Sequence, residues 1–169
     1  MSDERVLTGR EGIAKIGELI RDVRICMMTT LATDGSIDSR PMATQKTDFD
    51  GTVWFLTRFE SGKVGEIQQD SHVTLVYADP KNENYVTAKG KATLSRDREK
   101  IHELWNPMYK AWFPEGEGDP QISVVRVDVM EAQYWEASSS KLVVGMKYLA
   151  AAMTGGKVDV GGTGRVKVA

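Results

Sequence analysis

The stretch TTLATDGSIDSRPMAT, residues 29–44, decides the fold class of this 169-residue chain. It holds two extended runs on either side of the pair Asp34-Gly35. An Asp-Gly pair between two such runs is a strong signal for a β-hairpin, because a tight hairpin turn needs residues that tolerate positive φ. Residues 25–32 and 37–45 are therefore predicted to pair as antiparallel strands.

The β pattern continues along the chain. A turn at 48–51 leads into a predicted strand at 52–57, so the first three strands are expected to form an antiparallel meander. Runs rich in Val, Thr and Tyr predict further strands, which cover residues 72–79, 84–96, 122–129 and 131–137. Consecutive strands with short turns favour a small closed or nearly closed barrel over a parallel α/β sheet.

Helices are expected to flank this barrel. Helical spacing of apolar residues, capping serines and a break at Pro107 place them at residues 10–23, 61–70, 97–113 and 138–153. One domain is predicted over residues 1–154. The glycine-rich tail, residues 155–169, has little to bury and is expected to be mobile unless a partner covers it.

The composition argues against several classes of function. The formal net charge of -2 comes from acids and bases mixed along the chain, which argues against a nucleic-acid partner. No apolar run approaches the roughly 20 residues that cross a bilayer, and the first residues are charged, so neither membrane insertion nor secretion is expected. The single cysteine, Cys26, and the two histidines offer no metal-site spacing, and a cytoplasmic location fits.

The segment WFLTRFESGK, residues 54–63, predicts an anion site. Thr57, Ser61 and Lys63 lie between the end of a predicted strand and the start of a predicted helix. Such a junction offers free backbone N–H groups and the positive end of a helix dipole, to which these residues add two hydroxyls and an ammonium. An ordinary capped helix with solvated Lys63 and Arg58 is the alternative interpretation.

Arg40 is expected to join this anion site. It precedes Pro41, and proline within a strand marks an edge or a break in hydrogen bonding. If the meander is correct, the second strand brings Arg40 beside the end of the third. The alternative is a surface arginine paired with Asp38 or Glu60.

Three motifs occur in a defined order along the chain: TTLATDGSIDSRPMAT, then WFLTRFESGKVGEI, then a strand that ends in QYWEA. Together they resemble the flavin-binding split-barrel family that includes pyridoxamine 5'-phosphate oxidase, and within it the general stress protein 26 group. The likeness covers about residues 8–154. It implies a mainly β fold with flanking helices, namely a six-stranded antiparallel split β-barrel that forms a homodimer.

The resemblance also implies an FMN site between the two subunits. The residues that would contact the flavin are Arg40, Met42, Ala43, Thr44, Phe55, Leu56, Thr57, Ser61, Lys63 and Trp135. Of these, Arg40, Ser61 and Lys63 would hold the phosphate. The strand at 52–57 would contact the ring through its backbone, and Trp135 would approach from the other subunit.

The chain departs from the oxidase in two places. After Trp135 it continues EASSSKLVVGMK, whereas the oxidase has a substrate motif of the Arg-Leu-His-Asp-Arg type. Pyridoxamine phosphate oxidation is therefore not expected. The chain also has Gly62-Lys63 where the oxidase has an Arg-Lys pair, so one cation fewer would hold the phosphate and the affinity for FMN is expected to be modest.

The stretch LWNPMYKAWFPEG gathers four aromatic residues, Trp105, Tyr109, Trp112 and Phe113. Packing of these rings in the core or in a dimer interface is the first interpretation. Aromatic faces can also stack on a flavin ring or shape a substrate entrance, and Trp112 and Phe113 are the two expected to reach the pocket.

The predicted function is that of a cytoplasmic homodimer that binds FMN, with FAD as an alternative, and transfers electrons. The donor would be a reduced nicotinamide or a similar compound, and the acceptor an unknown small molecule. Whether the protein is an enzyme stays open, because a non-catalytic flavin store or sensor would use the same pocket. Haem or a deazaflavin in the barrel, or a barrel without a cofactor, are further alternatives.

Overall fold

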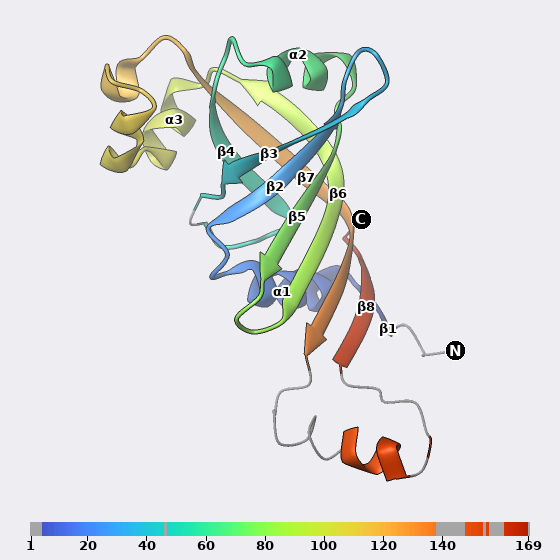
Figure 1. Cartoon of the computed structure of the whole chain (residues 1–169). Helices are drawn as coiled ribbons and strands as arrows, with labels where there is room; N and C mark the ends of the chain where they lie inside the picture. The colour runs from blue at the N-terminus through green and yellow to red at the C-terminus, as the bar shows by residue number, and fades with distance from the viewer. Residues whose placement is uncertain (1–4, 46, 138–147, 154, 156–160, 169) are drawn as a thin grey trace.

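The computed structural model describes residues 5–45, 47–137, 148–153, 155 and 161–168. These residues form one strongly curved sheet with helices at its two ends (Figure 1). The strands are β1 (Arg5–Thr8), β2 (Ile25–Leu31), β3 (Ile37–Ala43), β4 (Thr52–Arg58), β5 (His72–Asp79), β6 (Asn84–Ser95), β7 (Ile122–Ala137) and β8 (Gly161–Lys167). The mainly β class is confirmed, with eight strands in the described residues where the resemblance implied six.

The sheet has the strand order β1-β8-β7-β6-β5-β2-β3, and β4 pairs with β7. The β2–β3 hairpin predicted from Asp34-Gly35 is confirmed, with antiparallel pairing from Ile25 opposite Ala43 to Leu31 opposite Ile37. The prediction of a meander through β4 is wrong. A connection from Thr44 to Gly51 separates β3 from β4, so no tight turn forces the two strands to pair.

Strand β7 organises the barrel because it has partners along both edges. One edge pairs with β6, while the other pairs with β4 over residues 122–128 and with β8 over residues 131–137. The two strands predicted at 122–129 and 131–137 are therefore one strand. A register shift between Lys89 and Gly90 of β6 accommodates the extra residue of β7. A side chain at Gly90 would lie 2.3 Å from the carbonyl oxygen of Asp128, so this position needs glycine.

Helix α1 (Gly9–Ile20) closes one end of the barrel, and α2 (Gly62–Gln69) lies at the other end (Figure 1). The helix predicted over 97–113 is broken at Pro107 as expected, into α3 (Arg98–Leu104) and a 3-10 helix, η1 (Pro107–Ala111). A second 3-10 helix, η2, covers Gly116–Gly118. The helix predicted at 138–153 is seen at 148–153, and residues 138–147 lie outside the described part of the chain.

Two groups of buried side chains hold these elements together. The larger group fills the barrel and includes Met28, Phe55 and Leu75. The smaller group packs α3 and η1 against one face of β4 and β7, through residues such as Ile101, Phe113 and Val124. Among the described residues, no helix has the length and apolar character needed to cross a bilayer.

The structure differs from the expected mobile tail at residues 161–167, which form β8. This strand pairs antiparallel with β7 and parallel with β1, a strand that the sequence analysis missed. Val166 is fully buried. Gly164 lies against the ring of Tyr134, where an added side chain would come within 2.5 Å of the Tyr134 hydroxyl. Its lack of a side chain therefore allows close packing.

If β8 contributes to the core, Val166→Ala should lower the free energy of unfolding by about 2 kcal/mol, because it removes buried methyl groups. Chemical denaturation measures this change. The matched control is Val6→Ala in β1, where the side chain is 56% exposed and the expected loss is below about 0.5 kcal/mol. Equal, small losses in the two variants would show that β8 does not belong to the core.

Candidate functional site

A polar cradle lies where β4 ends and α2 begins. Lys63, in the first turn of α2, donates from Nζ to Thr57 Oγ1 at 2.9 Å. Ser61 occupies the N-cap position of α2, but its side chain makes no capping hydrogen bond, and its Oγ is buried without a hydrogen-bond partner. Buried hydroxyls are normally hydrogen-bonded, so Ser61 is a candidate for binding a group from outside the chain.

Arg40 reaches the same cradle from β3. Its guanidinium donates from Nη2 to Glu66 Oε2 at 2.8 Å and from Nη1 to Thr30 Oγ1. Thr30 in turn donates to Glu66 Oε2. Asp38, one of the two partners considered from the sequence, lies further away, at 4.0 Å from Nη2. The closest acidic partner of Arg40 is therefore Glu66 of α2.

The charges of the cradle act on one another. Burial, and then the positive charge of Arg40, lower the pKa of Lys63, while Glu66 opposes this shift. The hydrogen bond from Thr30, followed by the hydrogen bond and charge of Arg40, lowers the pKa of Glu66. The charge of Arg40 thus reaches Lys63, and both cations interact with Glu66 of α2.

Thr30 and Glu66 are the two cradle residues that the sequence analysis missed. Both left a signal. Alternation along β2 points Thr30 into the barrel, on the side of Cys26 and Met28. Glu66 follows Lys63 by three residues on α2, so the two side chains share a helix face.

The strand residues predicted to line a flavin divide into two groups. Met42 and Phe55 point into the core and are buried, so they could contact a ligand only through their backbone. Ala43 and Leu56 are partly exposed. Thr44 donates from Oγ1 to the Tyr77 hydroxyl at 3.3 Å.

A split in the barrel separates β3 from β4. Within the described chain, β3 has β2 as its strand partner and β4 has β7, so one edge of each strand is left without a strand partner. A backbone hydrogen bond from Gln45 N to Trp54 O, at 3.2 Å, closes one end of this split. Backbone groups along the rest of these edges can bind a planar polar ligand without breaking the sheet.

The two predicted tryptophans lie in different places. Trp112 is 60% exposed, and its carbonyl accepts a hydrogen bond of 3.1 Å from Arg58, the last residue of β4. Trp135 is 40% exposed. Thr57 pairs with Ser123, and from Ser123 to Trp135 β7 runs roughly 40 Å at about 3.3 Å per residue. Within one chain, Trp135 is therefore remote from the cradle.

The cradle fits a single phosphate group. An ammonium, a guanidinium, an unpartnered hydroxyl and the first turn of a helix converge there, and charge-assisted bonds to phosphate are among the strongest in proteins. The carboxylate of Glu66 works against a large negative charge. The residues therefore favour one phosphate over a polyanion.

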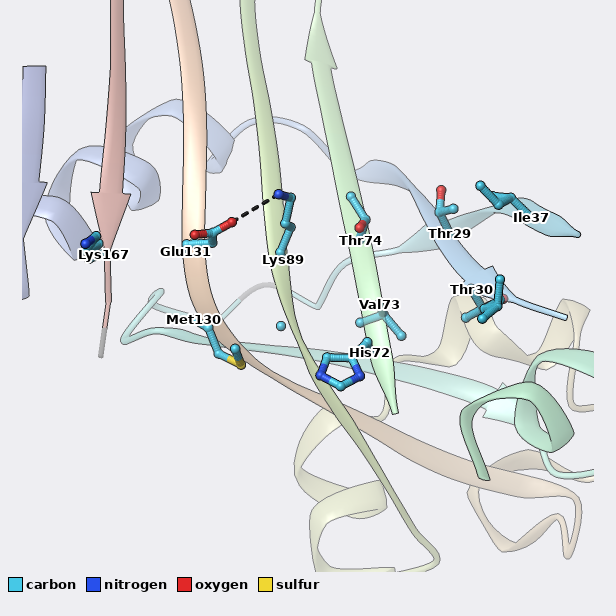
Figure 2. Close-up of a pocket in the computed structure, with 12 residues that line it drawn as sticks. Thr29, Thr30, Ile37, His72, Val73, Thr74, Lys89, Met130, Glu131 and Lys167 are labelled. Carbon is cyan, nitrogen blue, oxygen red and sulfur yellow. Dashed lines mark hydrogen bonds and ion pairs between the residues drawn. The ribbon is translucent and has the colours of Figure 1, made fainter. Parts of the chain in front are cut away.

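A separate hollow of about 680 Å³ lies on the outer face of the sheet (Figure 2). A row of residues crosses it from strand to strand, with Thr74 opposite Lys89 and Lys89 opposite Glu131. Lys89 Nζ bonds Glu131 Oε1 at 3.0 Å. Thr30 also borders this hollow, although its side chain points to the opposite, inner face of β2, where it bonds Arg40.

Comparison with known proteins agrees with this architecture. The family described as pyridoxamine 5'-phosphate oxidase like matches residues 11–159. The chain belongs to this family. Protein bli-3 of Neurospora crassa is 33% identical over 132 residues, which are 72% of this chain and 62% of bli-3. The chain thus spans less than two thirds of the length of this curated relative.

Solved structures of the family share the fold. General stress protein 26 of Bacillus anthracis aligns with a TM-score of 0.62 and 22% identity, over 73% of this chain and 91% of that one. A general stress FMN/FAD binding protein of Xanthomonas citri aligns with a TM-score of 0.67 and 26% identity, over 78% of this chain and 92% of that one. The pyridoxamine 5'-phosphate oxidase-like split barrel is therefore the fold of this chain.

Arg40→Met should destabilise the protein by about 2 kcal/mol at pH 7, because it leaves the mostly buried carboxylate of Glu66, 13% exposed, without its cation. The pKa of Glu66 is lower in the folded protein than in the unfolded chain, where it is about 4.3. The stability that Glu66 contributes is therefore fully present above pH 4.3 and is lost as the pH falls through the folded-state pKa. The difference in unfolding free energy between wild type and Arg40→Met should therefore become smaller toward low pH. Denaturation curves at pH 7 and pH 3 measure this loss of unfolding free energy, and a loss that does not depend on pH would contradict the pairing.

Proposed function

We propose that the cradle binds the phosphate of FMN, with the flavin ring lying along the split between β3 and β4. The convergence of Lys63, Arg40 and the unpartnered Ser61 at one end of the split carries this proposal. The family supports it, as does the Xanthomonas citri relative described as binding FMN/FAD. FAD is the alternative ligand.

The proposed roles of the residues follow from where they lie. Lys63, Ser61 and Arg40 bind the phosphate, and Thr57 orients the ammonium of Lys63. The unpaired backbone edges of β3 and β4 bind the polar edge of the ring, and Trp112, whose carbonyl accepts from Arg58 at the end of β4, would shield the ring. A bound flavin would supply the redox chemistry, so no side chain has to act as an acid or a base.

We propose on this basis an oxidoreductase that acts on a small molecule, with a reduced nicotinamide or a similar compound as donor. Oxidation of pyridoxamine phosphate is not proposed, because the substrate motif of the oxidase is missing after Trp135. A flavin store or sensor is the second candidate, favoured by Glu66, which already neutralises Arg40. Stopped-flow reduction by NADH or NADPH separates the two, since an enzyme is reduced fast and reoxidised by an acceptor.

The second element of the proposal is a homodimer, with the flavin at the contact between two copies. The outer face of β2, β3 and β5 exposes a band of apolar side chains, with exposed fractions from 37% to 72%, made of Ile25, Met27, Leu31, Ile37 and Val76. Monomeric proteins rarely leave a contiguous apolar patch of this kind. A partner copy would also bring its own Trp135 toward a site that this residue does not reach within one chain.

Lys63→Ala is expected to weaken FMN binding by about 2 kcal/mol, roughly 30-fold, through loss of a charge-assisted bond to the phosphate. Binding of riboflavin, which lacks the phosphate, should change little. Fluorescence quenching of each flavin on titration with protein measures both affinities. Lys81→Ala removes the same charge from an exposed turn and is the matched control. Equal losses for FMN and riboflavin would place the phosphate elsewhere.

The affinity for FMN should fall at alkaline pH. Because burial lowers the pKa of Lys63, the ammonium loses its proton below the ordinary lysine value of about 10.4, and the phosphate then loses a cation. Lys63→Arg stays charged and should keep its affinity over the same range, while titration of the flavin ring affects both proteins equally. FMN titrations between pH 7 and pH 10.5 provide the comparison, and parallel profiles would contradict the assignment.

Met27→Glu should convert the dimer to a monomer, because it places a charge at the centre of the exposed apolar band, between Pro41 and Val76. Light scattering after gel filtration measures the mass. The control Val6→Glu changes an exposed apolar residue of β1, away from the band, and should remain dimeric. A monomeric wild-type protein, or an unchanged mass in Met27→Glu, would rule out this interface.

A further inference from the structure

Glu66 interacts with both cations that the proposed function assigns to the phosphate. Its Oε2 accepts a hydrogen bond of 2.8 Å from Arg40 and a second bond from Thr30. It also acts on Lys63, whose pKa it raises against the effects of burial and Arg40. The side chains of Glu66 and Arg40 are 13% and 20% exposed, so the pair is partly shielded from water.

In this arrangement the guanidinium of Arg40 already donates hydrogen bonds to groups of the protein. Nη2 is bonded to Glu66 and Nη1 to Thr30. A phosphate that approaches Lys63 and Ser61 would carry up to two negative charges into a site that already holds a carboxylate. Two anionic groups then compete for one guanidinium, and they repel each other in a site that is partly shielded from water.

We propose that Glu66 is an internal competitor for Arg40, which keeps the affinity of the site for a phosphate-bearing flavin low and allows the flavin to exchange. The inference rests on the proposed function, since it needs a phosphate in the cradle. Glu66 acts through Arg40 and is therefore a positioning residue. The device suits a protein that takes up and releases its flavin, rather than one that retains it permanently.

Asp38 offers a matched comparison within the same site. Its carboxylate is 4.0 Å from Arg40 Nη2 and is 54% exposed, so water screens its effect on the guanidinium, and it also interacts with the carboxyl of Glu66. Asp38→Asn and Glu66→Gln change the net charge by the same amount. The two variants differ in whether the lost charge is buried against Arg40.

The test measures the affinity of wild type, Glu66→Gln and Asp38→Asn for FMN and for riboflavin, together with the rate of FMN dissociation. Glutamine keeps an oxygen that can accept from Arg40 and Thr30. Glu66→Gln is expected to bind FMN about tenfold tighter, the scale of one partly exposed charge-assisted bond, and to release it more slowly. Its affinity for riboflavin should not change, and Asp38→Asn should shift the FMN affinity by less than about twofold.

An FMN affinity that is unchanged or weaker in Glu66→Gln, while wild type binds FMN, overturns this inference and leaves the proposed function standing. If Glu66→Gln raises the affinity for riboflavin as much as the affinity for FMN, the inference is also overturned, because the effect would then not depend on the phosphate. A wild-type protein that binds neither flavin overturns the proposed function as well. If Glu66→Gln does not fold, Glu66→Ala replaces it in the test, and it too is expected to bind FMN more tightly than wild type.

Discussion

The pairing of β4 with β7, rather than with β3, is the constraint on which the rest of the structure depends. It places Val53 and Phe55 inside the barrel and leaves an edge of β3 and an edge of β4 without strand partners. It also determines where β4 ends, and therefore where α2 begins with Ser61 and Lys63. If β4 had paired with β3, the split would be closed and the backbone groups along it would be used by the sheet.

The cradle then results from three elements that meet at one end of the barrel. Strand β4 and helix α2 bring Thr57, Ser61 and Lys63, and strand β3 adds Arg40. The carboxylate of Glu66 balances part of the positive charge of the cradle. In the proposed function, this balance of charges sets how tightly a phosphate would be held and how readily it would leave.

The features predicted correctly from the sequence were local ones. The hairpin followed from the turn chemistry of Asp34-Gly35, and the break between α3 and η1 from Pro107, since a few neighbouring residues determine each. The partner of β4 was not predictable in this way, because Val53 and Phe55 fit equally well beside any apolar strand. The glycines of β8 looked like a mobile tail because their role is to allow close contact with β7, Gly164 with Tyr134 and its neighbours Gly161 and Gly162 with Glu136, more than twenty residues earlier in the chain.

The predicted site was recovered in part for the same reason. The hydrogen bond from Lys63 to Thr57 joins two residues of one short segment. Arg40 was expected there from a meander that put β3 beside β4, whereas the structure connects it to α2 through Glu66. Glu66 was missed because its importance depends on a contact across 26 residues with Arg40. The side chains of Met42 and Phe55 are buried, so only their backbone atoms could contact a flavin. This burial results from packing of the whole barrel, which the local sequence does not determine.

A crystal structure of the protein soaked with FMN tests the central claim most directly. The account predicts that the phosphate lies within hydrogen-bond distance of Lys63 Nζ and Ser61 Oγ, with the ring along the split between β3 and β4. A phosphate bound in the outer-face hollow near Lys89, or a ring away from the split, would contradict it.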